Sequence, residues 1–317
     1  MHVGLALVVL DSSSSVTGYA TGTLVYDLYW SLVNGAVQAY LYNHLKQAKQ
    51  TASYAKHISQ VWAYTFVGAA AANILSGFIA DATSLRIPYY ISIGSVVCAL
   101  LIATSLKTDI PGASTDQKHT SRHLVLSTLR HETVLAFAIR RIFSTYIFLT
   151  ILEFGQIYLL SFGVSAKKLG GLWAVTAVVC VAALLLSALA SRNHERFTWI
   201  YVAILVLFGF AAQTYVGIVL LFIVYACNEL LAVVTETELQ HNCPSKVRAT
   251  VLSIISFLAF GISIGLTWVF NALCGTDGIR IAVSTFSMSY SVIIASLIVA
   301  TWYTQRRSSA SLTSLQV

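Results

Sequence analysis

Apolar segments of about 20 residues alternate with short polar turns along almost the whole chain. Nine are long enough to cross the roughly 30 Å hydrocarbon core of a bilayer as helices. They predict spans over 19–42, 59–79, 90–106, 142–162, 169–190, 197–212, 217–234, 250–271 and 281–302. The apolar stretch 2–10 would cross only about half of the core, so we interpret it as the end of a further helix. The pattern predicts an all-α integral membrane protein with about nine full transmembrane helices and a partial N-terminal one.

One long polar stretch, 107–141, divides these spans unequally. We expect four parts: an incomplete N-terminal helical bundle over 1–106, a cytoplasmic central loop over 107–141, a complete six-helix bundle over 142–304 and a cytoplasmic tail over 305–317. The segment around 131–141 is a candidate surface helix that leads into the next span.

Composition and charge support a membrane location. The chain is 57% hydrophobic and 10% charged, whereas about a quarter of the residues in a soluble domain are charged. With 107–141 in the cytoplasm, most of the 19 Lys and Arg residues fall on the inner side, and Arg86, Lys167, Lys168 and Arg280 fall outside. This bias predicts a multi-pass plasma-membrane protein with a cytoplasmic C-terminus. The basic residues are then anchors near membrane lipid, not a surface for nucleic acid.

Polar side chains inside the spans are the candidates for function, because such groups are unfavourable against lipid and commonly line a pathway. Glu229 shares a helical face with Tyr225 and Glu236. Exposure to water near the outer surface explains Asp27 and Glu153 equally well, and we interpret Glu236 and Glu238 as solvated near the inner surface. The predicted substrate or ion pathway consists of Asp27, Asn34, Gln38, Glu153, Gln156, Asn228 and Glu229.

The sequence lacks the motifs of a catalytic or cofactor site. The five cysteines form no CxxC or metal-ligand spacing, and neither a nucleotide-binding loop nor a nucleophile elbow is present. We therefore expect no metal, no cofactor and no enzymatic activity.

Two stretches resemble the major facilitator superfamily, in a bacterial branch. In 31–46, Gly35, Ala39 and Tyr42 match the end of the fourth helix, although Asn43 stands where an Asp is usual. In 243–253 the resemblance to the loop between the tenth and eleventh helices is more specific, and it gives Pro244 and Arg248 a structural role. The matching residues there are Pro244, Ser245, Arg248, Ala249, Thr250 and Ser253.

The resemblance implies a secondary transporter that moves a small solute by alternating access between two helical bundles. Proton coupling stays open, with Glu229 and Asp27 as candidates. The resemblance also implies that the first two helices of the family pattern, and part of the third, are missing from this chain. The alternative is a truncated membrane scaffold or interaction protein that does not transport.

Overall fold

The described part of the chain is built from helices. In this computed structural model the structure describes residues 37–38, 40–84, 87–105 and 122–314. A helical segment covers 37–47 apart from residue 39, and no strand occurs in these ranges. The further elements are η1 (Thr51–Ser53), α3 (Tyr54–Ala82), α4 (Ile87–Ser105), α5 (Arg122–Arg130), α6 (Glu132–Leu160), α7 (Ala166–Leu184), α8 (Ser187–Arg192), α9 (His194–Ala211), α10 (Tyr215–Asn242), α11 (Arg248–Asp277) and α12 (Ile279–Ser314).

Six helices are long and apolar enough to cross a membrane within these ranges. They cover Thr51–Ile79, Glu132–Leu160, His194–Ala211, Tyr215–Asn242, Arg248–Gly275 and Ile279–Ala300. Two shorter apolar helices, Tyr90–Ala99 and Lys168–Leu184, fall on two more of the nine predicted spans. The all-helical membrane fold is thus observed in the described residues, which contain six candidate spans. The count of about nine full spans is not confirmed, and the predicted span 19–42 and the partial helix 2–10 lie mostly or wholly outside the described residues.

Two helix limits differ from the sequence prediction. The segment expected over 169–190 is divided into α7 and α8, because the helix is interrupted at Leu185 and Leu186. Helix α6 begins at Glu132, well before the expected start at Ile142. Arg140 and Arg141 are therefore helical residues, and Arg140 is buried.

Glycines with positive φ follow two of the long helices. Gly163 has φ 78° just beyond the end of α6, and Gly278 has φ 82° at the end of α11. This left-handed conformation is costly for residues with a Cβ atom and commonly ends helices. Each glycine lets the chain turn back toward the next helix.

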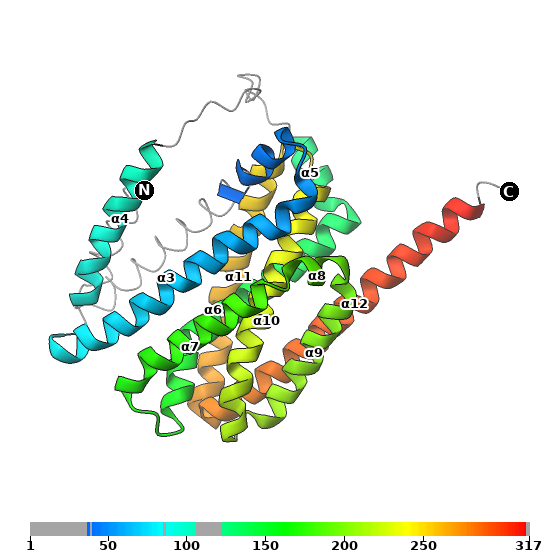
Figure 1. Cartoon of the computed structure of the whole chain (residues 1–317). Helices are drawn as coiled ribbons and strands as arrows, with labels where there is room; N and C mark the ends of the chain where they lie inside the picture. The colour runs from blue at the N-terminus through cyan, green and yellow to red at the C-terminus, as the bar shows by residue number, and fades with distance from the viewer. Residues whose placement is uncertain (1–36, 39, 85–86, 106–121, 315–317) are drawn as a thin grey trace.

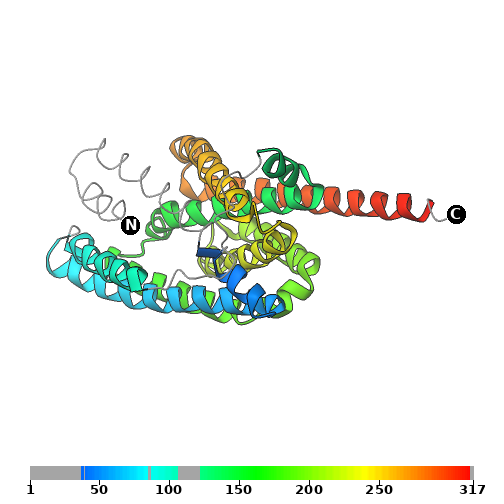
Figure 2. The same ribbon diagram turned by 90° about the horizontal axis from the view of Figure 1, so that it is seen from above.

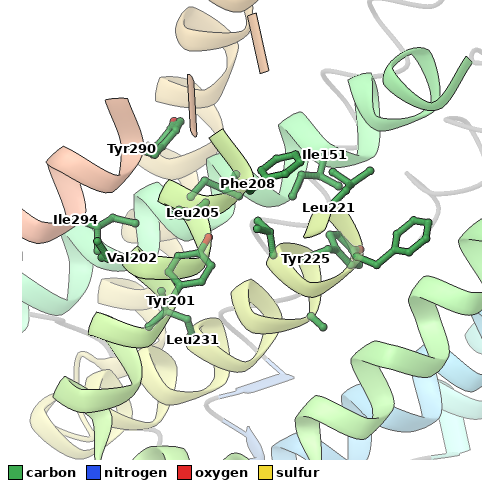
Figure 3. Packing of buried hydrophobic residues seen from close by; sticks show 14 of the residues in the cluster. Ile151, Tyr201, Val202, Leu205, Phe208, Leu221, Tyr225, Leu231, Tyr290 and Ile294 are labelled. Carbon is green, nitrogen blue, oxygen red and sulfur yellow. The ribbon is translucent and has the colours of Figure 1, made fainter. Parts of the chain in front are cut away.

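Helix α10 lies at the centre of the packing, between α6, α7 and α9, with α3 also against it. In the apolar 18-residue stretch of α10, 61% of the residues are buried, whereas only 6% are buried in the corresponding stretch of Thr51–Ile79. Figure 3 shows the core around α10, where Leu221 and Tyr225 meet Tyr201 and Phe208 from α9 and Tyr290 from α12. The buried polar side chains of α10 are Asn228, Glu229, Thr235, Glu236, Thr237 and Gln240.

Helix α3 belongs to the part of the chain before the central polar stretch, and it packs mainly on α7. Figures 1 and 2 show α3 running beside α7, with α4 packed on its outer side. A Cβ atom on Gly170 would lie only 2.8 Å from the backbone oxygen of Asn73. The small residue therefore permits the close approach of the two helices.

Candidate functional site

A cavity of about 270 Å³ lies between α3, α6, α10 and α11. Aromatic rings form much of its wall, among them Trp62 and Phe66 from α3, Phe148 from α6 and Tyr225 from α10. Thr65, Thr145 and Ser256 contribute hydroxyl groups. Concave apolar sites with a few polar groups are the usual form of small-molecule sites, so this cavity is the candidate functional site.

Three charged side chains line the cavity: Arg141 from α6, and Glu229 and Glu236 from α10. Arg141 is close enough to act electrostatically on both carboxylates. No hydrogen bond joins Arg141 or Glu229 to another residue in the described part of the chain. A cationic and an anionic group therefore share the cavity without an intramolecular hydrogen bond.

Glu236 is held by partners from the N-terminal part of the chain. Gln38 donates to its Oε2 at 2.7 Å, and the Tyr54 hydroxyl donates to its Oε1 at 2.6 Å. Glu236 is 2% exposed, Gln38 is 5% exposed and Tyr54 is fully buried. Both carboxylate oxygens thus accept a hydrogen bond from a buried donor. The three side chains join α10 to the 37–47 segment and to the start of α3.

Asn228, beside Glu229, forms a different network. Its Oδ1 accepts from the Ser144 hydroxyl at 3.1 Å and from the Tyr201 hydroxyl at 3.2 Å, and its Nδ2 donates to the Ser144 carbonyl at 3.1 Å. All three bonds lie among α6, α9 and α10. Asn228 is fully buried and ties these three helices together.

Arg248 organises the loop between α10 and α11. It donates to the Gln240 and Cys243 carbonyls at 3.1 and 2.8 Å, and to Asn43 Oδ1 at 2.8 Å. Its guanidinium lies 4.1 Å from the centre of the Tyr42 ring. The two stretches that carry the family resemblance are therefore in contact. Asn43, at the position where an Asp is usual, accepts the bond from Arg248 as an uncharged amide.

Two further bonds join the same segments at this end of the helices. The Tyr42 hydroxyl lies 3.0 Å from His241 Nδ1, and Lys46 donates to the Ser245 hydroxyl at 2.9 Å. Nearby Cys243, in the loop between α10 and α11, is 2% exposed. Burial raises the pKa of its thiol to about 11, although Arg248 opposes the shift. This loop end, defined by residues 42–46 and 241–248, is thus closed by contacts between distant parts of the sequence.

The structure separates the residues of the predicted pathway. Asn228 and Glu229 line the cavity, and Tyr225 and Glu236 share that face of α10 as predicted. Gln38 is buried against Glu236. Glu153 and Gln156 are exposed on α6 and line neither this cavity nor a smaller one of about 50 Å³. Asp27 and Asn34 lie outside the described residues.

Sequence reasoning missed two of the three charged residues of the cavity. Arg141 was expected at the end of the central loop, but α6 begins nine residues earlier. The interpretation of Glu236 as solvated is wrong, because α10 continues to Asn242 and buries it. The spacing of Glu229 and Glu236, seven residues apart on one helical face, was the signal available. Pro244 is exposed just after α10.

Among the described residues, no three His, Cys, Asp or Glu side chains gather in a way that could hold a metal ion.

The family model of the Major Facilitator Superfamily matches residues 58–267. The chain belongs to the major facilitator superfamily. None of the curated proteins matches the chain. The matched region contains every residue that lines the cavity, from Trp62 to Phe260. Membership in the major facilitator superfamily makes this a multi-pass membrane protein of a transporter family, and members of that family are typically not enzymes.

Proposed function

We propose that the chain is a secondary transporter that moves a small solute by alternating access, with the cavity of about 270 Å³ as its solute site. The observation that carries this proposal is the origin of the cavity walls. One wall comes from α3, before the central polar stretch, and the others come from α6, which begins within that stretch, and from α10 and α11, which follow it. A site between two such parts is exposed to alternate sides when the parts rock against each other.

The bonds at the loop end and the adjacent bonds to Glu236 support this proposal, because they would have to break for the cavity to open there. Gln38 and Tyr54 bind Glu236, and Asn43 binds Arg248. Each pair joins the chain before residue 60 to the chain after residue 235. We infer that the structure represents the state closed at the loop end.

We also propose that the loop end faces the cytoplasm of a plasma membrane, which puts the C-terminus in the cytoplasm. Basic residues from both parts of the chain support this orientation, because Lys and Arg accumulate on the cytoplasmic side. Exposed examples are Lys46, Lys49, Arg122, Arg130 and Lys246. The exposed apolar side chains of the six candidate spans would contact membrane lipid.

Proton coupling is part of the proposal, with Glu229 as the coupling group in the described chain and Asp27 as a second candidate. Glu229 lines the cavity and makes no hydrogen bond to another described residue. It could therefore exchange a proton when the cavity opens. An imposed pH gradient should drive solute flux in proteoliposomes, and a protonophore should abolish that flux.

The transport proposal can be tested before the solute is identified. Cells that contain wild-type protein or Glu229→Gln in equal membrane amounts would be supplied with a mixture of labelled metabolites. We expect at least one solute to accumulate or to be depleted with the wild type only. Glu238→Gln is the matched control, because Glu238 lies on the same helix but does not line the cavity. Identical solute profiles with the wild type and Glu229→Gln would contradict the proposal.

A further inference from the structure

We propose that the solute is a small zwitterion with an apolar or aromatic body, whose anionic group binds Arg141 and whose cationic group binds Glu229. This inference rests on the proposed transport function and specifies the chemistry of the solute. It starts from the two charged groups of the cavity that make no hydrogen bond to a described residue.

Buried polar and charged groups are normally paired, because the loss of water without a new partner is costly. Arg141 is partly buried and Glu229 is 9% exposed. Both line the same cavity, and no ion pair of 4.0 Å or less joins them. A bound solute could supply the missing partner to each group without breaking an existing hydrogen bond.

The register between α6 and α10 places Arg141 and Glu229 at similar positions along the helix axes. The bonds between Ser144 and Asn228 fix the register, and the Tyr158 hydroxyl, near the end of α6, lies against Gly217, near the start of α10, so the two helices run in opposite directions. Arg141 precedes Ser144 by three residues, and Glu229 follows Asn228. The two positions therefore differ by less than one helical turn, about 5 Å, along the helix axes. One small dipolar solute can span such a separation, since each hydrogen bond adds about 3 Å.

Glu236, the third charge of the cavity, explains why a zwitterion fits better than a cation. Both of its carboxylate oxygens already accept hydrogen bonds, from Gln38 and Tyr54. Glu236 therefore has less remaining hydrogen-bonding capacity for a solute than Glu229. A purely cationic solute would satisfy Glu229 but leave Arg141 without a partner. A purely anionic solute would satisfy Arg141 but leave Glu229 without a partner. Only a solute with both charges pairs both groups.

The residues of the cavity walls indicate the chemistry of the uncharged part of the solute. Trp62, Phe148 and Tyr225 present aromatic rings to the cavity, and rings bind apolar or aromatic bodies through their large contact area. The cavity volume of about 270 Å³ is near the lower end of the range for small-molecule sites. A compact solute is therefore expected.

The charge requirement can be tested with three ligands of nearly identical shape. L-Phenylalanine carries both charges, phenethylamine lacks the carboxylate, and 3-phenylpropanoate lacks the ammonium group. Binding to the purified full chain would be measured by calorimetry. We expect phenylalanine to bind at least tenfold more tightly than either analogue, because each lost charge-assisted hydrogen bond costs about that factor. This series uses the wild type and needs no variant.

Two variants test which residue binds each charged group of the solute. Arg141→Gln should weaken phenylalanine binding about tenfold without weakening phenethylamine binding. Glu229→Gln should weaken phenylalanine binding about tenfold without weakening 3-phenylpropanoate binding. The matched controls are Arg130→Gln, at an exposed arginine on α5, and Glu238→Gln. Both controls should bind all three ligands as the wild type does.

Phenethylamine binding as tightly as phenylalanine would overturn the assignment in favour of a cation site, and tight 3-phenylpropanoate would overturn it in favour of an anion site. Absence of binding by all three ligands would also overturn it. None of these results would remove the transport proposal, which the comparison of solute profiles tests independently.

Discussion

Asn228 and Glu236 lie two turns apart on α10, and both are buried and hydrogen-bonded, but their partners differ. Asn228 binds Ser144 and Tyr201, within the part of the chain after the central polar stretch. Glu236 binds Gln38 and Tyr54, which precede that stretch. The first set of bonds stabilises one group of helices. The second joins that group to the rest of the molecule, and it must break if the parts rock apart. Glu229, between them along the helix, faces the cavity.

The largest expected effect follows from removing the Asn228 side chain, which joins α6, α9 and α10. Asn228→Ala would leave the Tyr201 hydroxyl without its present partner in a buried site, and the Ser144 hydroxyl would keep only its long bond, of 3.5 Å, to the carbonyl of residue 228. Each unsatisfied buried group costs about 1–3 kcal/mol, so the free energy of unfolding should fall by about 3 kcal/mol or more. Thermal unfolding in detergent would measure this. Unchanged stability would show that Asn228 does not fix α6, α9 and α10.

A smaller loss of stability is expected where α3 approaches α7. Gly170→Val introduces a Cβ atom that meets the backbone oxygen of Asn73, and the helices must separate at a cost of about 1–3 kcal/mol. Gly171→Val is the matched control, because a Cβ atom there meets nothing within 4 Å. Equal melting temperatures for the two variants would exclude a tight contact between α3 and α7 at this point.

Glu236→Gln tests the bridging network with little loss of stability. Removal of the charge weakens the bonds from Gln38 and Tyr54, since a hydrogen bond to a charged group is roughly twice as strong as a neutral one. A cysteine substituted for Ala69, a half-buried residue on the cavity wall, should then react about tenfold faster with a membrane-impermeant maleimide added at the loop end. Glu238→Gln should leave the rate unchanged. Equal rates in all three backgrounds would mean that Glu236 does not hold this end closed.

The smallest effect is expected at Arg248. Arg248→Lys keeps the charge but cannot make all three bonds to Gln240, Cys243 and Asn43. The buried Cys243 thiol has its pKa raised to about 11, so it is almost wholly protonated at pH 8. Loosening the loop would expose Cys243 and lower its pKa toward the usual value. Its maleimide labelling at pH 8, followed by peptide mass spectrometry, should rise several-fold, whereas Lys246→Gln should leave it unchanged. Slow labelling in Arg248→Lys would contradict this role.

The sequence predicted the all-helical membrane fold, because apolar runs of the length that a bilayer requires are a strong signal. It also predicted that Glu229 shares a face with Tyr225 and Glu236, since helical spacing determines that face. The family resemblance singled out Arg248 and the stretch 31–46, and the structure brings Arg248 into contact with Asn43 of that stretch. These inferences needed only local pattern.

The remaining features depend on helix length and on contacts between distant residues. Arg141 was expected outside the span, at the end of the candidate surface helix 131–141, because charge usually ends a predicted span, but that segment and the span form one continuous helix. Glu236 seemed solvated because it lies near a span end, yet Gln38 and Tyr54 bury it from nearly 200 positions earlier in the chain. No local pattern encodes that pairing. The places of Arg141 and Glu236 in the cavity were therefore beyond sequence reasoning, whereas Asn228 and Glu229 were among the predicted pathway residues.

The central claim is that the parts on either side of the Glu236 bridges move apart during function. The most direct measurement is the distance between spin labels at positions 46 and 246 in a cysteine-free variant, in lipid, because Lys46 and Ser245 are in contact in the closed state. We expect two distance populations in otherwise wild-type protein, with Glu236→Gln shifting weight to the longer one. A single short distance in both proteins, unchanged by any added solute, would contradict the claim.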